Sequence, residues 1–276
     1  MTEEDLLGSK PIKYWDEIAK DWEETRTHRL WRVHSDAVNT RLFERWIPSV
    51  EVGRVLKTDL FDEATGETGL YPLLASVGRT AVGIDIAPLI MRRAQSQHQT
   101  LLVVGADVGC LPFADQSFDV VISNSTLDHM DSLDDVAKAL RELCRVLKFG
   151  GQLLMTLDNL SNPIIALRNS LPAPLIERIG LVPYYVGASC GPRRLQKMVL
   201  AAGFEPLEVQ ATMHCPRVLM VPITDILDRW AARAVKKRLL QWLMAWEVLE
   251  RWPTRYITGH FVALRAVRRE DRAPNR

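Results

Sequence analysis

Residues 105–130, GADVGCLPFADQSFDVVISNSTLDHM, decide the fold of this 276-residue chain. The run TLLVVGAD at 100–107 is apolar and ends on an acid, and SFDVVISNS at 117–125 has a continuous apolar centre. Such a centre is typical of a strand that is covered on both faces. The two runs therefore predict two strands of a parallel sheet, each of which ends in polar residues.

A helix is predicted after the second of these strands. Ser132 and Asp135 form an S-x-x-D capping signal. An apolar stripe at helical spacing follows, made of Val136, Leu140, Leu143 and Leu147. We expect Gly150 and Gly151 to end this helix. The next strand is then GQLLMTL at 151–157.

The same alternation of strands and amphipathic helices extends in both directions along the chain. It predicts further strands at 54–61, 80–85, 206–212 and 259–267, and further helices at 70–77, 88–97 and 191–204. Alternating strands and helices imply a parallel sheet with helices on both faces. We therefore predict an α/β fold with a doubly wound, mostly parallel seven-stranded sheet of Rossmann-like type. Ligands bind such sheets at the carboxyl ends of the strands.

Two aspartates stand at predicted strand ends. Asp85 ends the strand TAVGID, where a carboxylate can accept hydrogen bonds from ribose hydroxyls or cap the next helix. Asp107 ends TLLVVGAD, where it can accept from an adenine amino group or stabilise a turn. Each residue taken alone leaves both interpretations open.

Order and spacing favour the functional interpretation. VGIDIAP at 82–88, the stretch 105–130 and RVLKFGGQLLM at 145–155 together resemble the class I S-adenosylmethionine-dependent methyltransferases. The similarity is to the small-molecule branch related to the ubiquinone and menaquinone methyltransferases, over about residues 50–160 and more loosely over 190–267. It implies an additional antiparallel final strand, S-adenosyl-L-methionine as cofactor and methyl transfer to a small molecule.

The resemblance also implies roles for individual residues. Asp85 would bind the ribose and Asp107 the adenine side of the cofactor. Ile86 and Val108 would pack on the base, and Asn124 ends the fourth strand at the same edge of the sheet.

The first loop departs from the family pattern. The family has a glycine-rich turn after the first strand, whereas this chain has VLKTDLFDEATGETG at 55–69, where only Gly66 and Gly69 remain. Glycine there avoids Cβ clashes and permits positive φ. We predict that this loop still holds the amino-acid end of the cofactor, with an acid on its ammonium (Asp59, Asp62 or Glu63) and a hydroxyl from Thr58 or Thr65. The alternative is a loop that has lost cofactor affinity.

His129, just beyond the fourth strand, is the candidate general base for an acceptor that must lose a proton. His214 and Tyr184 or Tyr185 are weaker candidates. The structural alternative for His129 is a loop histidine that orients the backbone. We predict no metal ligands.

Composition limits the partners. The formal net charge of +1 gives no reason to expect nucleic acid as a partner. The acidic start MTEEDLLGSK is not a signal peptide, no apolar run reaches a membrane span, and the four cysteines form no CxxC pair. We therefore expect a cytoplasmic protein with a small-molecule acceptor, and the sequence sets no oligomeric state.

Tryptophans concentrate at the two ends of the chain. We divide it into an N-terminal helical cap (1–49), an α/β domain (50–267) and a mobile tail (268–276), with inserted caps at about 160–190 and 214–253. Trp15 and Trp22 lie in the first cap, and Trp230, Trp242 and Trp246 lie in the last. We interpret these residues as a lid over an apolar or aromatic acceptor. Plain helix packing and, less favoured, peripheral membrane contact beside residues 236–238 are the alternatives.

Two other function classes stay open. The first is a protein of this fold that transfers no methyl group, either through other S-adenosylmethionine chemistry or in a binding or scaffold role, because of the first loop. The second is a nicotinamide-dependent oxidoreductase, which the lack of G-x-G-x-x-G after the first strand disfavours.

Overall fold

The computed structural model describes residues 9–25, 29–47, 52–66, 69–171 and 185–270. Within them, one sheet has the strand order β3-β2-β1-β4-β5-β7-β6, and β7 is antiparallel to both of its neighbours. The predicted doubly wound α/β fold and its antiparallel final strand are thus confirmed. The strands are β1 (Val52–Lys57), β2 (Gly78–Asp85), β3 (Leu102–Gly105), β4 (Phe118–Asn124), β5 (Leu147–Asp158), β6 (Phe204–Thr212) and β7 (Phe261–Arg268).

The helices of the body follow the predicted alternation, and further helices form the caps. Those of the body are α4 (Phe61–Thr65), α5 (Tyr71–Val77), α6 (Pro88–Gln97), η1 (Leu127–His129), α7 (Leu133–Val146) and α10 (Pro192–Ala201). Those of the caps are α2 (Ser9–Thr25), α3 (Arg29–Trp46), α8 (Pro163–Ser170), α11 (Arg217–Trp230), α12 (Arg233–Ala245), η2 (Trp246–Arg251) and α13 (Arg255–Thr258).

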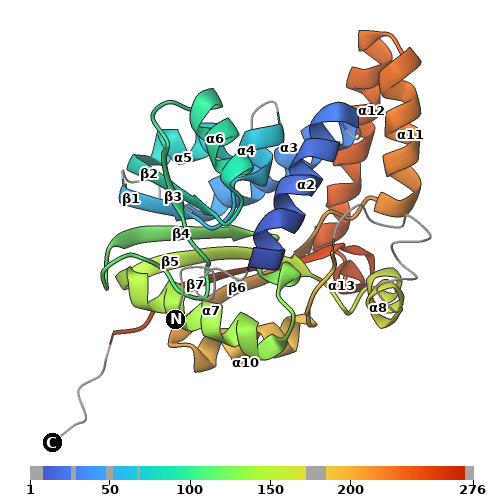
Figure 1. Ribbon diagram of the computed structural model, residues 1–276. Coiled ribbons are helices and arrows are strands. Elements are labelled where there is room, and N and C mark those ends of the chain that lie inside the picture. Colours follow the sequence, from blue (N-terminus) through green and yellow to red (C-terminus); the bar gives the residue numbers. More distant parts are fainter. Residues whose placement is uncertain (1–8, 26–28, 48–51, 67–68, 172–184, 271–276) are drawn as a thin grey trace, which may run out of the picture.

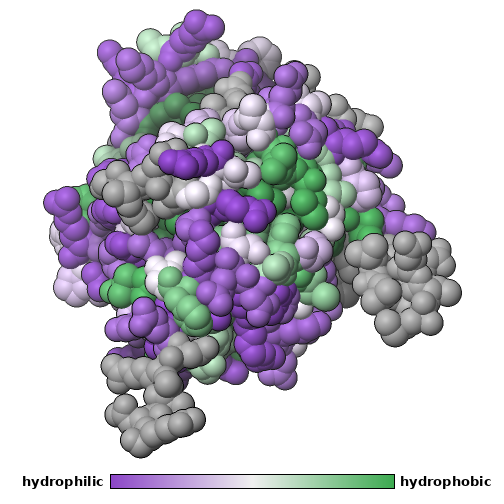
Figure 2. Space-filling model, turned by 90° about the vertical axis from the view of Figure 1, so that its left-hand side faces the viewer, coloured by the Kyte–Doolittle hydropathy of each residue, from purple (hydrophilic) through white to green (hydrophobic). Residues whose placement is uncertain are grey.

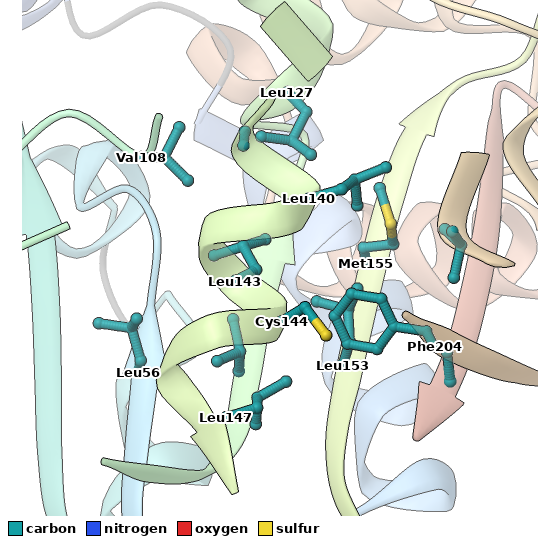
Figure 3. Packing of buried hydrophobic residues seen from close by; sticks show 14 of the residues in the cluster. Leu56, Val108, Leu127, Leu140, Leu143, Cys144, Leu147, Leu153, Met155 and Phe204 are labelled. Atoms are coloured by element: carbon teal, nitrogen blue, oxygen red, sulfur yellow. The ribbon is translucent and has the colours of Figure 1, made fainter. Parts of the chain in front are cut away.

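Helices cover both faces of the sheet, with α5 and α6 on one side and α7 and α10 on the other (Figure 1). The α7 side encloses a core that includes Leu56, Leu140, Leu143 and Phe204 (Figure 3). A second core on the opposite face joins the sheet to α3, α4, α5 and α6. Burial on both faces explains why the central strands read as continuous apolar runs.

A third apolar cluster anchors the caps to the body. Trp31 and Val38 of α3, Leu243 of α12, Met213 after β6 and Phe261 of β7 are buried together. The N-terminal cap and the late insertion therefore meet, although about 200 residues separate them along the chain. Both lie beside the sheet at the right of Figure 1.

Some predicted boundaries were wrong. Ser132 caps α7 through its side chain, as predicted, but α7 ends at Val146 and β5 begins at Leu147, so Gly150 and Gly151 lie within β5. The inserted cap predicted at about 214–253 contains three helices, α11, α12 and η2. The short helix α4 was not predicted. The predicted mobile tail lies largely outside the described residues.

The distribution of hydrophilic and hydrophobic residues on the surface is typical of a globular protein. On the face that contains the β1–β3 side of the sheet, hydrophilic residues predominate and hydrophobic residues form separate patches (Figure 2). In the described ranges, no helix has the length and apolar composition needed to cross a membrane.

Candidate active site

A cavity of about 1630 Å³ opens at the carboxyl ends of the parallel strands. Its size exceeds that of typical small-molecule pockets, which are roughly 300–1,000 Å³. The cavity brings together most of the residues predicted from sequence: Thr58, Asp59, Asp62, Asp85, Ile86, Asp107, Val108, Asn124 and His129. Gly66 and Gly69 are not among the residues that line it.

Asp85 connects two loops of the site. Its Oδ2 accepts from the Leu60 amide at 3.0 Å and its Oδ1 from the Ala87 amide at 2.9 Å. Burial raises the pKa of Asp85 to about 6. Asp85 does not cap α6, whose N-cap position is Ala87. A carboxylate has about four acceptor positions, so two remain for hydroxyl donors.

The adenine side of the predicted site is built by the loop after β3. Asp107 is exposed, and its Oδ1 accepts from the Gly109 amide at 2.6 Å, which is the turn role weighed above. Val108 is buried and Ile86 half-buried, and both line the cavity. Asn124 accepts from the Thr156 hydroxyl at 2.9 Å, which leaves its amide nitrogen as a donor.

The first loop is organised by a buried ion pair rather than by glycines. Lys57, the last residue of β1, is fully buried, and its Nζ lies 2.8 Å from Oε2 of the equally buried Glu63. The same Nζ donates to the Asp59 carbonyl oxygen at 2.7 Å. Burial lowers the pKa of Lys57, but the carboxylates of Asp59, Glu63 and Asp62 outweigh burial and raise it. Lys57 was not predicted from the sequence, although a lysine at the end of a buried strand indicates a buried acidic partner.

The two glycines complete this loop. Glu63 Oε1 accepts from the Leu70 amide at 2.9 Å. Gly69 has a φ of +53°, and a Cβ there would lie 2.8 Å from Glu63 Oε1. At Gly66 a Cβ would lie 2.5 Å from the Asp62 carbonyl oxygen. The structure therefore places both glycines against the loop backbone and Glu63, not toward a ligand.

The three acids of this loop have different surroundings. Glu63 does not line the cavity, because Lys57 and Leu70 occupy its carboxylate. Asp62 lines the cavity and accepts from Arg32 of α3 at 3.1 Å. Asp59 also lines the cavity, and its Oδ2 accepts from the Thr126 hydroxyl at 3.0 Å. Burial raises the pKa of Asp59, and Lys57 opposes this.

Asp36 of α3 is a cavity residue that sequence reasoning missed. Its pKa is raised to about 7, first by burial and then by the Asp62 carboxylate, while Arg32 acts in the opposite direction. Nothing in the helical pattern of residues 29–46 indicated contact with the first loop. Asp36, Asp59 and Asp62 thus form an acidic end of the cavity.

His129 lies in η1 and lines the cavity. Its Nδ1 is 2.9 Å from the Tyr185 carbonyl oxygen, and its ring meets the Trp15 ring edge-on at 4.9 Å between centroids. In the neutral ring Nδ1 must then carry the proton, so Nε2 is the ring nitrogen that can accept one. His214 is buried against Thr258 and Ala211 outside the cavity, and Tyr184 lies outside the described residues.

The other end of the cavity is mainly aliphatic. Its apolar lining comes from α8 and α11, with Ile164, Ile165, Leu167, Val218, Val221 and Pro222. At its floor, Arg168 forms a buried ion pair with Asp158. His260 Nε2 lies 3.5 Å from Asp158 Oδ1, and burial lowers the pKa of His260 well below its usual value. These polar residues were not predicted.

The tryptophan lid is only partly as predicted. Trp15 and Trp31 of the N-terminal cap line the cavity. Trp230 is 85% exposed, and neither it nor Trp242 or Trp246 lines the cavity, so the expectation that these three face the acceptor was wrong. The side chain of Trp22 lies outside the described residues.

Comparison with known proteins supports the interpretation of this fold. Residues 61–155 match the family model described as a methyltransferase domain. A malonyl-acyl-carrier-protein O-methyltransferase of Enterobacter lignolyticus is 31% identical over 129 residues, which are 47% of this chain and 46% of that protein. A demethylmenaquinone methyltransferase of Corynebacterium efficiens is 32% identical over 120 residues, 44% of this chain and 49% of that protein.

Solved structures share the fold. A methyltransferase from Thermotoga maritima superposes with a TM-score of 0.60 at 17% identity, over 94% of this chain and 99% of that chain. The chain spans about half the length of the curated relatives it matches. The matched sequence and the strand order are similar to those of class I S-adenosylmethionine-dependent methyltransferases, which confirms the predicted resemblance.

Proposed function

We propose that this chain transfers a methyl group from S-adenosyl-L-methionine to a small, apolar or aromatic acceptor. One observation carries the proposal: polar residues from four successive strand ends line one cavity whose other end is aliphatic. Asp85 would accept from the ribose, Asp107 and Val108 would meet the adenine, and Asp59 with Asp36 would face the ammonium. When bound, the cofactor supplies an activated methyl group on a sulfonium.

The chain's own residues would align the acceptor and exclude water. The aliphatic walls of α8 and α11 suit an apolar body, and Trp15 covers the side near His129. If the acceptor is a hydroxyl or an acidic carbon, His129 Nε2 is the group that would take its proton as the methyl bond forms. Such general-base help typically contributes about a hundredfold or more.

Calorimetry with S-adenosylmethionine and with NADH tests the cofactor assignment. Asp85→Ala removes a charge-assisted hydrogen bond worth about 1.5–3 kcal/mol, so it should weaken S-adenosylmethionine binding roughly ten- to a hundredfold. Asp119→Ala, which removes a half-buried carboxylate that accepts from the Arg54 amide and from Lys148, is the control and should leave binding unchanged. An Asp85→Ala protein that binds as tightly as the parent would refute the ribose role.

The acceptor is tested by transfer of labelled methyl groups. Demethylmenaquinone and a malonyl thioester are suitable first acceptors because relatives are named for them. His129→Gln should lower the rate of transfer to any acceptor that must be deprotonated, while cofactor affinity stays constant. An unchanged rate would assign His129 to positioning Tyr185 instead.

The rival function, a protein of this fold without methyl transfer, rests on the altered first loop. Competition between methylthioadenosine and S-adenosylhomocysteine separates the two. If Asp59 and Asp36 hold the ammonium, S-adenosylhomocysteine should bind more tightly. Equal affinities would show that the loop contributes nothing to cofactor binding and would favour the rival.

A further inference from the structure

The helical hairpin formed by α11 and α12 carries an exposed apolar stripe. On α11, Leu219, Ile223, Ile226 and Trp230 are spaced four, three and four residues apart, so they lie along one face of the helix. All four are exposed, from 41% at Ile223 to 85% at Trp230. The two helices extend side by side away from the body (Figure 1), so the far end of α11 and the start of α12 form a projecting tip.

The tip is strongly basic. Residues 226–242 hold five basic side chains and one acidic one, Asp228. Lys236 is paired with Asp228 at 2.8 Å. The other four basic residues, Arg229, Arg233, Lys237 and Arg238, are exposed. They lie on both sides of the connection between α11 and α12, so the hairpin brings them to one tip. Sequence reasoning counted only 236–238 and therefore underestimated the charge.

The stripe is continuous with the aliphatic end of the cavity. Val218, Val221 and Pro222 of α11 line the cavity, and Trp230 lies nine residues beyond Val221, about 14 Å along the helix. Ile164 and Leu167 of α8, which lies below α11 in Figure 1, also line the cavity and are more than half exposed. The mouth of the cavity is therefore apolar along both α8 and α11 and lies at the base of the tip.

We propose that the α11–α12 tip docks on the surface of an anionic lipid bilayer, with Trp230 and Ile226 in the interface and the basic residues on the lipid headgroups. Tryptophan and lysine or arginine are the residues that interfacial helices use, and clusters of four or more basic residues bind anionic leaflets. A second copy of the chain is a poorer partner, because two tips of the same charge would repel each other. If the proposed function holds, this contact places the apolar mouth beside a membrane-resident acceptor.

Co-sedimentation with vesicles tests the docking without any methyl donor. The full chain should bind vesicles of phosphatidylcholine mixed with phosphatidylglycerol, bind phosphatidylcholine alone much more weakly, and dissociate as salt is added. Replacing basic residues should lower the partition coefficient about fivefold per residue, so Arg233→Gln, Lys237→Gln and Arg238→Gln together should lower it about a hundredfold.

Tryptophan fluorescence locates the contact. Vesicle binding should shift the emission of the parent to the blue, and Trp230→Ser should remove most of that shift. Trp252→Ser is the matched control, since Trp252 is 56% exposed but follows η2, outside the tip. Three results would each overturn the proposal. The triple variant could bind vesicles as the parent does, or Trp252→Ser could lose as much of the blue shift as Trp230→Ser. The parent could also form a dimer that is absent in the triple variant.

The same variants keep the two proposals apart. Calorimetry of each tip variant with S-adenosylmethionine should give the parent affinity, because no substituted residue lines the cavity. Loss of vesicle binding with intact cofactor binding supports docking. Intact vesicle binding in a chain that binds no cofactor would leave the docking standing and remove the proposed function.

Discussion

Lys57→Met tests whether the first loop depends on its buried ion pair. Methionine has nearly the shape of lysine without the ammonium, so the substitution removes the contacts of Nζ with Glu63 at 2.8 Å and with Asp59 at 3.4 Å. It leaves Glu63, which is fully buried, with no cation beside its Oε2. An unpaired buried carboxylate must take a proton or remain ionised at high cost.

The cost follows from the pKa of Glu63. Burial already raises the pKa of Glu63 in the parent, and Lys57 opposes this. Without Lys57 the folded-state pKa rises further above the unfolded value of about 4.3, so the carboxyl is protonated in the folded chain and ionised in the unfolded one. At about 1.4 kcal/mol per pH unit, protonation at about pH 7 costs roughly 4 kcal/mol, and at about pH 5 roughly 1 kcal/mol. Because the shift is upward for an acid, the stability of the variant relative to the parent falls as pH rises.

Urea unfolding of parent and variant at both pH values measures this difference. Lys57→Met with Glu63→Gln should recover most of the stability at about pH 7, because replacing both partners of a buried pair is often nearly neutral. Lys148→Met is the matched control: Lys148 is half-exposed and paired with Asp119 at 2.7 Å, so its loss should cost less than about 1 kcal/mol at either pH. Equal destabilisation by Lys57→Met at both pH values would refute the reasoning.

Three further predictions concern the site and its supports. Burial raises the pKa of Asp36 to about 7, and a bound ammonium favours the ionised form of this carboxyl. The affinity for S-adenosylmethionine, measured by calorimetry, should therefore increase up to about tenfold from about pH 6 to about pH 8. Asp36→Asn should make this affinity nearly independent of pH. Gly69→Ala should lower the free energy of unfolding more than Gly150→Ala. Both glycines have positive φ, but a Cβ at Gly150 would meet nothing within 4 Å. Equal urea midpoints of the two variants would contradict this. Ser132→Ala should cost about 1 kcal/mol by removing the cap bond to the Asp135 amide, as read from urea unfolding.

The alternation of strands and helices was predictable because local patterns dominate it. The continuous apolar run at 117–125 and the capped stripe from Ser132 each form the predicted element, and Pro88 begins α6. Strand ends then place Asp85, Asp107 and Asn124 at one edge of the sheet, since parallel strands end on the same side. The sequence therefore predicted this side of the cavity well.

Contacts between distant segments were not predictable from pattern. Asp36 meets the first loop only because α3 packs across the sheet, and Arg32 on the same helix pairs with Asp62. Trp230 belongs to an amphipathic pattern, yet that pattern does not say whether its apolar face meets the body or solvent. In the structure the beginning of α11 faces the cavity and its end projects away.

The altered first loop changes the charges at the acidic end of the cavity. A glycine-rich turn offers amide donors, which attract negative groups. Here Asp36, Asp59, Asp62 and Glu63 outnumber Lys57 and Arg32, and burial raises the pKa of Asp36 and Asp59. A ligand that carries positive charge relieves that imbalance, and a neutral nucleoside does not. The proposed donor has an ammonium, a sulfonium and a carboxylate, and therefore one net positive charge. Under the proposed function, this acidic end would favour the intact cofactor over its neutral fragments.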